Sequence, residues 1–157
     1  MKLVKSKLST RTKTALILNM LLVTIGLLFG IRYIFSSQLM PYHLRAMGVA
    51  TWDNVISQYK LMVLTFMKVA GLGMLSVSVG IIILILNPLK NNKMWSRLSV
   101  FILFFVHYIP LTVFISILKF NTKASPPLGL NIIALCVAFI AFLLTKNRGK
   151  LSAQFAQ

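Results

Sequence analysis

Acidic side chains are almost absent from this sequence: Asp53 is the only Asp or Glu among 157 residues, whereas Lys and Arg number 17. A single carboxylate excludes any site within one chain that needs two of them, such as the acid/base pairs of glycosidases and aspartic proteases. An excess of cations can indicate nucleic-acid binding, but here the cations stand mostly between long apolar runs rather than in one patch. We therefore expect no nucleic-acid partner and interpret the cations as markers of membrane topology.

Metal-binding and catalytic motifs are absent as well. The one cysteine, Cys136, lies in an apolar run, which excludes an intrachain disulfide and a cysteine-based metal site. His43 and Asp53 fall short of the three protein ligands of catalytic zinc, and His107 lies too deep in another apolar run to join them. No G-x-S-x-G, Walker A, H-E-x-x-H or Gly-rich dinucleotide motif occurs. The sequence thus predicts no catalytic residues, no metal and no cofactor.

Charged residues of both signs make up only 11% of the chain and hydrophobic residues 58%, against roughly 25% and 45–50% in ordinary globular proteins. A chain this short cannot hide so much apolar surface from water, so lipid must cover the excess. Helices need about 20 apolar residues to cross a hydrocarbon core of ~30 Å. The sequence therefore predicts an all-α integral membrane protein with a single domain over residues 1–157, a bundle of four transmembrane helices at residues 15–35, 61–86, 98–118 and 128–145.

The basic N-terminal stretch, residues 1–14, precedes an apolar run that is longer than the 7–15-residue core of a signal peptide and lacks a clear cleavage site. We expect it to remain attached to the first helix. A mitochondrial presequence is the alternative, because the stretch is rich in Lys, Ser and Thr and has no acid.

The basic residues predict the orientation of the chain. Eleven lie on one side of the predicted helices and four on the other, which by the positive-inside rule places both termini in the cytoplasm, as in a multi-pass protein of a cell inner membrane. The eleven are Lys2, Lys5, Lys7, Arg11, Lys13, Lys90, Lys93, Arg97, Lys146, Arg148 and Lys150. The four are Arg45, Lys60, Lys119 and Lys123, while Arg32 and Lys68 lie within apolar segments.

The outward segment, residues 36–59, is far longer than the 2–8 residues that usually join neighbouring helices. Pro41 can start a short helix that Gly48 ends, and Thr51 or Asp53 can cap the next long helix. We expect this short helix to lie at the membrane interface, with rings suited to the headgroup level at Tyr42, Trp52 and Tyr59.

Small residues at helical spacing predict where the helices pack, because lipid supplies no hydrophobic drive for helix association. The second helix has small residues on two opposite faces, so we expect protein on both of its sides. The residues expected at interfaces are Gly26 and Gly30 in the first helix, Gly71 and Ser78 on one face of the second, Gly73, Ser76 and Gly80 on its other face, and Ala134 and Ala138 in the fourth.

Three basic side chains lie within the predicted transmembrane helices. His107 lies near the middle of the third helix, three residues before Pro110, where an ionisable group is costly and usually faces the bundle interior. It is either a polar clamp between helices or a ligand or proton site. Lys68 and Arg32 can lie at similar depth and receive an anion, although Arg32 can equally extend to the interface.

The outward segment supplies the other candidates: His43, Arg45 and Asp53. Loops that exceed what connectivity needs are often binding surfaces on a rigid support. Asp53 can alternatively be a helix cap or pair with Arg45 or Lys60.

Three functions fit this sequence. The first is a non-enzymatic accessory subunit or lipid-interacting component of a membrane complex, with lipids, other membrane proteins or further copies of the chain as partners. The second is a small transporter or channel subunit, which would have to oligomerise because four helices are few for a pathway. The third is a membrane redox or lipid-modifying enzyme that uses the outward His, Asp and Arg.

Overall fold

The computed structural model describes residues 9–86 and 94–145. It is all-helical over these residues, with no strand among them, and contains α1 (Thr10–Phe35), α2 (Pro41–Ala46), α3 (Ser57–Leu84), α4 (Met94–Asn121) and α5 (Leu128–Leu144). The four long helices correspond to the four apolar stretches of the sequence, and α2 lies in the long connection between the first two. Lys90, Lys93, Lys146, Arg148 and Lys150, as well as the residues before Ser9, lie outside the described ranges.

Three of the long helices, α1, α3 and α4, begin four or five residues earlier than predicted, because the helix starts in polar residues before the apolar run does. α1 begins at Thr10, five residues earlier than predicted, since Ser9 caps it by accepting a hydrogen bond from the Thr12 amide at 3.3 Å. The predicted cap of α3 is wrong: Ile56 occupies the N-cap position without a side-chain hydrogen bond, and Thr51 and Asp53 lie in the preceding turns.

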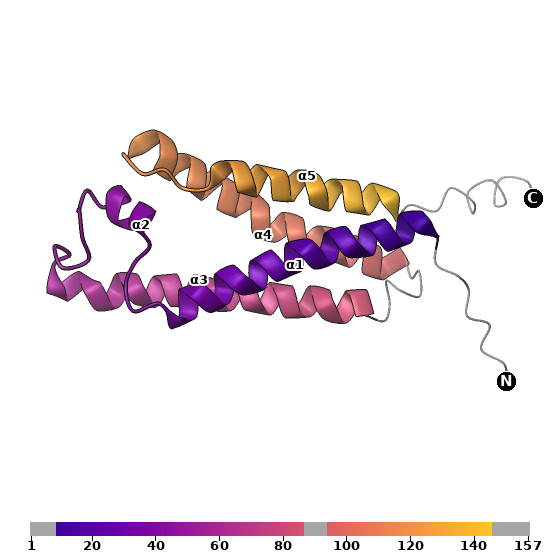
Figure 1. Cartoon of the computed structure of the whole chain (residues 1–157), viewed down its shortest axis with the longest axis horizontal. Coiled ribbons are helices and arrows are strands. Elements are labelled where there is room, and N and C mark those ends of the chain that lie inside the picture. The colour runs from indigo at the N-terminus through magenta and orange to yellow at the C-terminus, as the bar shows by residue number, and fades with distance from the viewer. Residues whose placement is uncertain (1–8, 87–93, 146–157) are drawn as a thin grey trace, which may run out of the picture.

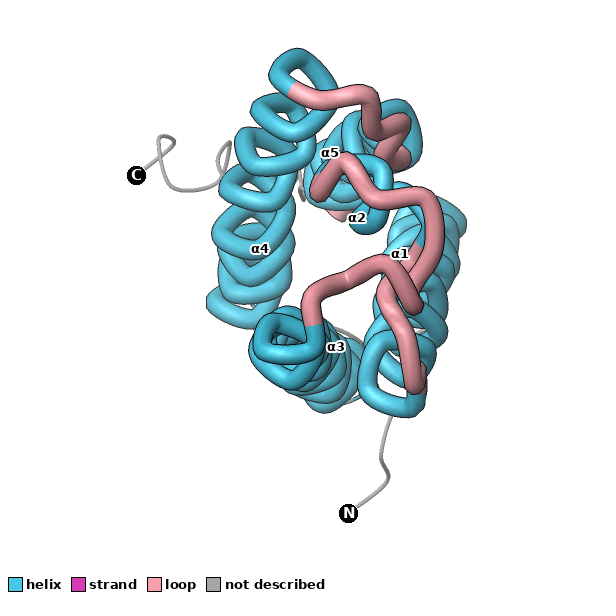
Figure 2. Tube along the Cα trace, turned by 90° about the vertical axis from the view of Figure 1, so that its left-hand side faces the viewer, coloured by secondary structure: helices cyan, strands magenta, loops and turns pink. Residues whose placement is uncertain are grey.

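The long helices form a ring in which α1 packs between α3 and α5, and α4 closes the ring against α5 and, less extensively, α3. Figure 1 shows the four helices lying side by side, with the start of α1, the end of α3, the start of α4 and the end of α5 at one end. In the view along the bundle, α2 lies over the opposite end, among the four long helices (Figure 2). We call the end of the bundle at which α1 starts the inner end, and the end that α2 covers the outer end.

The closest helix contact is the crossing of α1 and α3, where two glycines face each other. A Cβ on Gly71 would stand 2.8 Å from the Gly30 carbonyl oxygen, and one on Gly30 would stand 2.9 Å from the Gly71 carbonyl oxygen. A Cβ on Gly26 would similarly meet the Ser78 hydroxyl at 2.7 Å. The backbones approach this closely only because neither glycine has a side chain.

The opposite face of α3 has no neighbour within the described part of the chain. A Cβ on Gly73 or Gly80 would meet nothing within 4 Å, and Ser76 is exposed. The described residues therefore cover one small-residue face of α3 and leave the other open.

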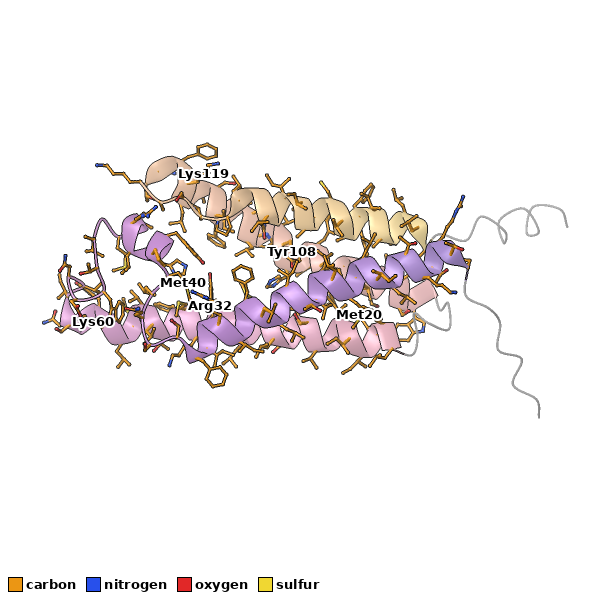
Figure 3. The ribbon with its side chains drawn as sticks, viewed as in Figure 1. Met20, Arg32, Met40, Lys60, Tyr108 and Lys119 are labelled. Atoms are coloured by element: carbon orange, nitrogen blue, oxygen red, sulfur yellow. The ribbon has the colours of Figure 1, made fainter. Side chains whose placement is uncertain are left out.

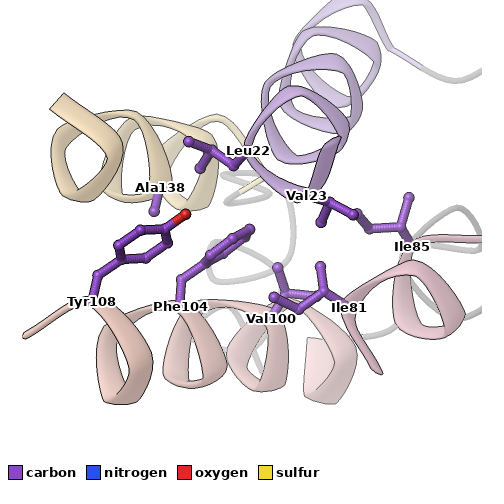
Figure 4. Close-up of a cluster of buried hydrophobic side chains, with 8 residues drawn as sticks. All are labelled: Leu22, Val23, Ile81, Ile85, Val100, Phe104, Tyr108 and Ala138. Carbon is purple, nitrogen blue, oxygen red and sulfur yellow. The ribbon is translucent and has the colours of Figure 1, made fainter. Parts of the chain in front are cut away.

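The main core lies toward the inner half of the bundle, where all four long helices contribute side chains (Figure 4). Ala134 is half-buried against this core, and Ala138, 2% exposed, belongs to it. Its buried members are Leu22, Val23, Ile81, Ile85, Val100, Phe104, Tyr108 and Ala138.

Outside this core the bundle exposes large apolar side chains along its whole length. Ile17 on α1, Phe66 on α3, Val106 on α4 and Ile133 on α5 are each more than half exposed. By length and composition α1, α3 and α4 could cross a membrane, whereas α5 is equally apolar but has 17 residues. Three long apolar helices are thus compatible with a membrane protein.

Candidate functional site

The outer end is closed by a cap, which we define as the connection between α1 and α3 with the short helix α2 in it. Pro41 occupies the first turn of α2, and Gly48, with φ of 73°, reverses the chain after it so that the Val49 amide donates to the Leu44 carbonyl at 3.0 Å. The cap has its own apolar cluster against α1 and α3, with Tyr33, Leu39, Met40, Leu44, Val55 and Met67 buried. The cap is therefore packed against α1 and α3 of the bundle.

Three rings join the cap to α1. The Tyr33 and Tyr42 hydroxyls form a hydrogen bond, and the His43 ring lies edge-on to Tyr33 with centroids 5.8 Å apart and tilted against Tyr42 at 4.2 Å. Burial raises the pKa of Tyr42 and lowers the pKa of His43 below its usual range. The Nδ1 atom of His43 is buried and has no hydrogen-bond partner in the part of the chain that the structure describes. His43 is thus a neutral packing residue of the cap.

The exposed face of the cap holds Arg45 and Asp53. Arg45 Nη1 donates to the Ser125 hydroxyl at 3.3 Å and so connects α2 to the segment between α4 and α5. Lys60 Nζ donates to the Asp53 backbone carbonyl at 3.5 Å and lies 5.6 Å from the centroid of the Trp52 ring. No hydrogen bond or ion pair between described residues joins any two of His43, Arg45 and Asp53.

A shallow open groove runs beside the cap, where α1 ends and α2 begins. Its volume is about 430 Å³, and Arg32, Phe35 and Gln38 are among the residues that line it. Arg32 donates from Nε to the Met40 sulfur at 3.4 Å and is exposed (Figure 3). Lys68, on α3, is half-buried one residue after the buried Met67.

In the middle of the bundle the interhelical polar contact is made by Asn131 rather than by His107. Asn131 Nδ2 donates to the Tyr108 carbonyl at 3.2 Å and to the Thr112 hydroxyl, which joins α5 to α4. His107 is half-buried with its ring edge-on to Tyr108 at 5.2 Å. The Tyr108 carbonyl also accepts a hydrogen bond from the Thr112 hydroxyl at 2.7 Å, so Asn131 binds to an existing polar contact within α4.

The inner end contains a charged residue that the sequence placed in a loop. Arg97 lies in the first turn of α4 and is only 8% exposed, so its assignment to the connection before this helix was wrong. It lines a small cavity together with Asn19 and Thr145, which come from α1 and the end of α5. Hydropathy could not reveal this, because Arg97 stands at the edge of an apolar run, where cations usually reach water.

No group of three His, Cys, Asp or Glu side chains that could hold a metal ion occurs within residues 9–86 and 94–145. No family model, curated protein or solved structure matches the chain. What the protein does must therefore be argued from its own surfaces and cavities.

Proposed function

We propose that the chain is a membrane protein with four transmembrane helices, α1, α3, α4 and α5. The support is the exposed apolar surface of all four, which lipid would cover and water would not tolerate. The 17 residues of α5 extend about 25 Å at the helical rise, near the lower limit for a span of the hydrocarbon core. Because α5 packs between α1 and α4, it crosses the same layer as they do.

We further propose that the inner end faces the cytoplasm. Arg11 and Lys13 are exposed there at the start of α1, and the remaining cations assigned to this side, apart from Arg97 within α4, flank the same helix ends in the sequence. Cations are retained on the cytoplasmic side of membrane proteins, and the outer end has fewer of them.

Within the membrane, we propose a non-enzymatic role as an accessory subunit that binds another membrane protein through the cap. The observation that carries this proposal is the cap itself, an ordered unit fixed to α1 by Tyr33 and Tyr42 and to the segment after α4 by Arg45. Its surroundings carry the exposed cations Arg45, Lys119 and Lys123 but one carboxylate, Asp53. Lys60 and Lys119 lie at this same end (Figure 3). A rigid cationic surface fits an acidic segment of a partner.

Charge reversal tests this role. The tagged chain is extracted from its own membranes in mild detergent, and its complexes are separated by native electrophoresis. Arg45→Glu and Lys123→Glu should each reduce the higher-mass complex at least tenfold, because like charges facing each other cost several kcal/mol. Arg11→Glu, which reverses an exposed cation at the inner end, is the matched control and should leave the complex intact.

Two results would contradict the proposal. The wild-type chain could migrate only as a monomer, in which case the cap has no partner under these conditions of extraction. Alternatively, a complex that contains only this chain and survives both charge reversals would assign the association to a second copy rather than to an acidic partner.

A further inference from the structure

Arg97 is the only buried Lys or Arg in the described ranges 9–86 and 94–145. The other described cations, such as Lys13 and Arg32, are exposed or half-exposed. Arg97 therefore differs from the cations that only mark topology, because most of its side chain, including the Nε atom, is shielded from solvent. Removing a guanidinium from water is costly unless hydrogen bonds and a counter-charge replace the lost hydration.

The described residues supply neither a hydrogen bond to the Nε atom of Arg97 nor a counter-charge. Its Nε is buried and has no hydrogen-bond partner among the residues that the structure describes. The carbonyls of Ala141 and Phe142, which belong to residues lining the same cavity, already accept hydrogen bonds from Thr145. The only side-chain carboxylate of the chain, Asp53, lies in the cap at the opposite end. Within residues 9–86 and 94–145, no side chain therefore supplies a counter-charge to Arg97.

The cavity in front of Arg97 has the composition of an anion site. It lies between α1, α4 and α5, and its polar lining consists of Arg97, Asn19 and Thr145. Asn19 is 4% exposed and its side chain bonds to no described residue, so its amide N–H groups remain free to donate. The first turn of α4, in which Arg97 lies, adds the positive end of a helix dipole.

The volume of this cavity, about 10 Å³, limits what can enter. It is close to the minimum that accommodates one water-sized group, so one oxygen atom of an oxyanion fits and a whole phosphate group does not. A ligand must therefore keep most of its bulk at the mouth of the cavity. A phosphodiester between lipid chains and a headgroup has this shape, and arginine binds phosphate oxygens through paired N–H donors.

We propose that Arg97 and Asn19 bind one phosphate oxygen, and that this phosphate belongs to a phospholipid of the leaflet at the inner end. The lipid source rests on the proposed membrane function, whereas the recognition of phosphate does not. Basic pockets between transmembrane helices on the cytoplasmic side are a known mode of binding anionic headgroups. The acyl chains would lie along the exposed apolar side chains of the bundle.

The test uses the full chain in dodecyl maltoside and measures its Tm during titration with three probes. These are phosphatidylglycerol, a diacylglycerol with the same acyl chains but no phosphate, and inorganic phosphate. Phosphatidylglycerol should raise the Tm, and Arg97→Gln should weaken this response about tenfold or more, because hydrogen bonds to charged groups are among the strong ones. Arg11→Gln, the matched loss of an exposed cation at the same end, should respond as the wild type does.

The other two probes, diacylglycerol and inorganic phosphate, distinguish a lipid phosphate from a free phosphate ion. A response to phosphatidylglycerol without one to inorganic phosphate identifies a lipid, and a response to both identifies the phosphate group as sufficient. An equal response to diacylglycerol, or an unchanged response in Arg97→Gln, overturns the proposal. If Arg97→Gln folds poorly, Arg97→Lys is measured in its place. This variant keeps the charge but not the paired donors, so it should retain only part of the response to phosphatidylglycerol. Extraction of the chain from membranes by alkaline carbonate would refute the membrane function separately.

Discussion

Gly71 and Gly73 look alike in the sequence but have different surroundings in the fold. Both were expected at helix interfaces, on opposite faces of the same helix. In the structure a Cβ on Gly71 would collide with α1, and a Cβ on Gly73 would meet open space. Periodicity reveals which residues share a face, but it does not reveal which face has a neighbour, because that depends on the order of helices around the ring.

Substitution by alanine at these two positions should therefore have different effects on stability. Gly71→Ala places a methyl group 2.8 Å from the Gly30 carbonyl oxygen, which should lower the free energy of unfolding by about 1 kcal/mol or more. Gly73→Ala adds the same atom without a contact and should leave stability unchanged or raise it by up to ~1 kcal/mol through helix propensity. Thermal unfolding in detergent, followed by circular dichroism, measures both. Equal losses would place a partner helix against Gly73.

Arg97 and His43 show what a linear pattern misses at the residue scale. In the sequence Arg97 stands shortly after a polar connection, which suggests an exposed side chain. Its burial results from the contact of the first turn of α4 with α1 and α5. His43 stands in a polar segment, and only the return of the cap onto Tyr33 encloses its ring. In both cases the signal is a contact between distant parts of the chain.

At the scale of elements, α1, α3, α4 and α5 could be predicted because each coincides with an apolar run of the sequence, although α5 is shorter than the other three. Their ends could not be predicted so well, since α1 and α3 begin in polar residues, after the N-cap residues Ser9 and Ile56. The helix between Pro41 and Gly48 was expected from its turn residues, and the structure has it at Pro41–Ala46. Its docking onto α1 and α3 was not, because amphipathic rings such as Tyr42 fit a membrane interface as well as a protein surface.

The burial of His43 makes the cap sensitive to acid. Burial lowers the pKa of His43 in the closed cap, whereas an open cap gives the ring its ordinary value of about 6.5. Below that pH the open state binds a proton that the closed state does not, so the closed cap loses stability as the pH falls and is independent of it above. The rings that face His43, Tyr33 and Tyr42, are uncharged in this range.

This opening can be followed by the emission of Trp52, which is half-buried in the cap cluster, in a Trp95→Phe background. Between pH 8 and pH 5 we expect a red shift that develops below about pH 6.5. His43→Phe retains a ring but cannot bind a proton, and its emission should stay constant. An identical transition in His43→Phe would assign the acid sensitivity to another group.

At the scale of the whole molecule, the ring of helices gives the chain two chemically different ends. The cap closes the outer end, and the start of α1 lies with the end of α5 at the inner end (Figure 1). Under the proposed membrane function, this arrangement corresponds to an even number of spans. If α5 did not cross the membrane, the residues after it would lie on the same side as the cap.

Single cysteines distinguish these arrangements. The experiment introduces one cysteine at a time into a Cys136→Ser background. Lys13, Arg45 and Lys123 are each exposed and are replaced in turn. Lys146→Cys reports the side that the chain reaches after α5. A membrane-impermeant maleimide added to intact cells should label Arg45→Cys and Lys123→Cys, and it should label Lys13→Cys and Lys146→Cys only after permeabilisation, as the distribution of basic residues predicts. Labelling of Lys13→Cys and Arg45→Cys from the same side would refute the crossing of α1. Labelling of Lys146→Cys in intact cells would leave three spans, because α5 would then lie against the outer side of the membrane.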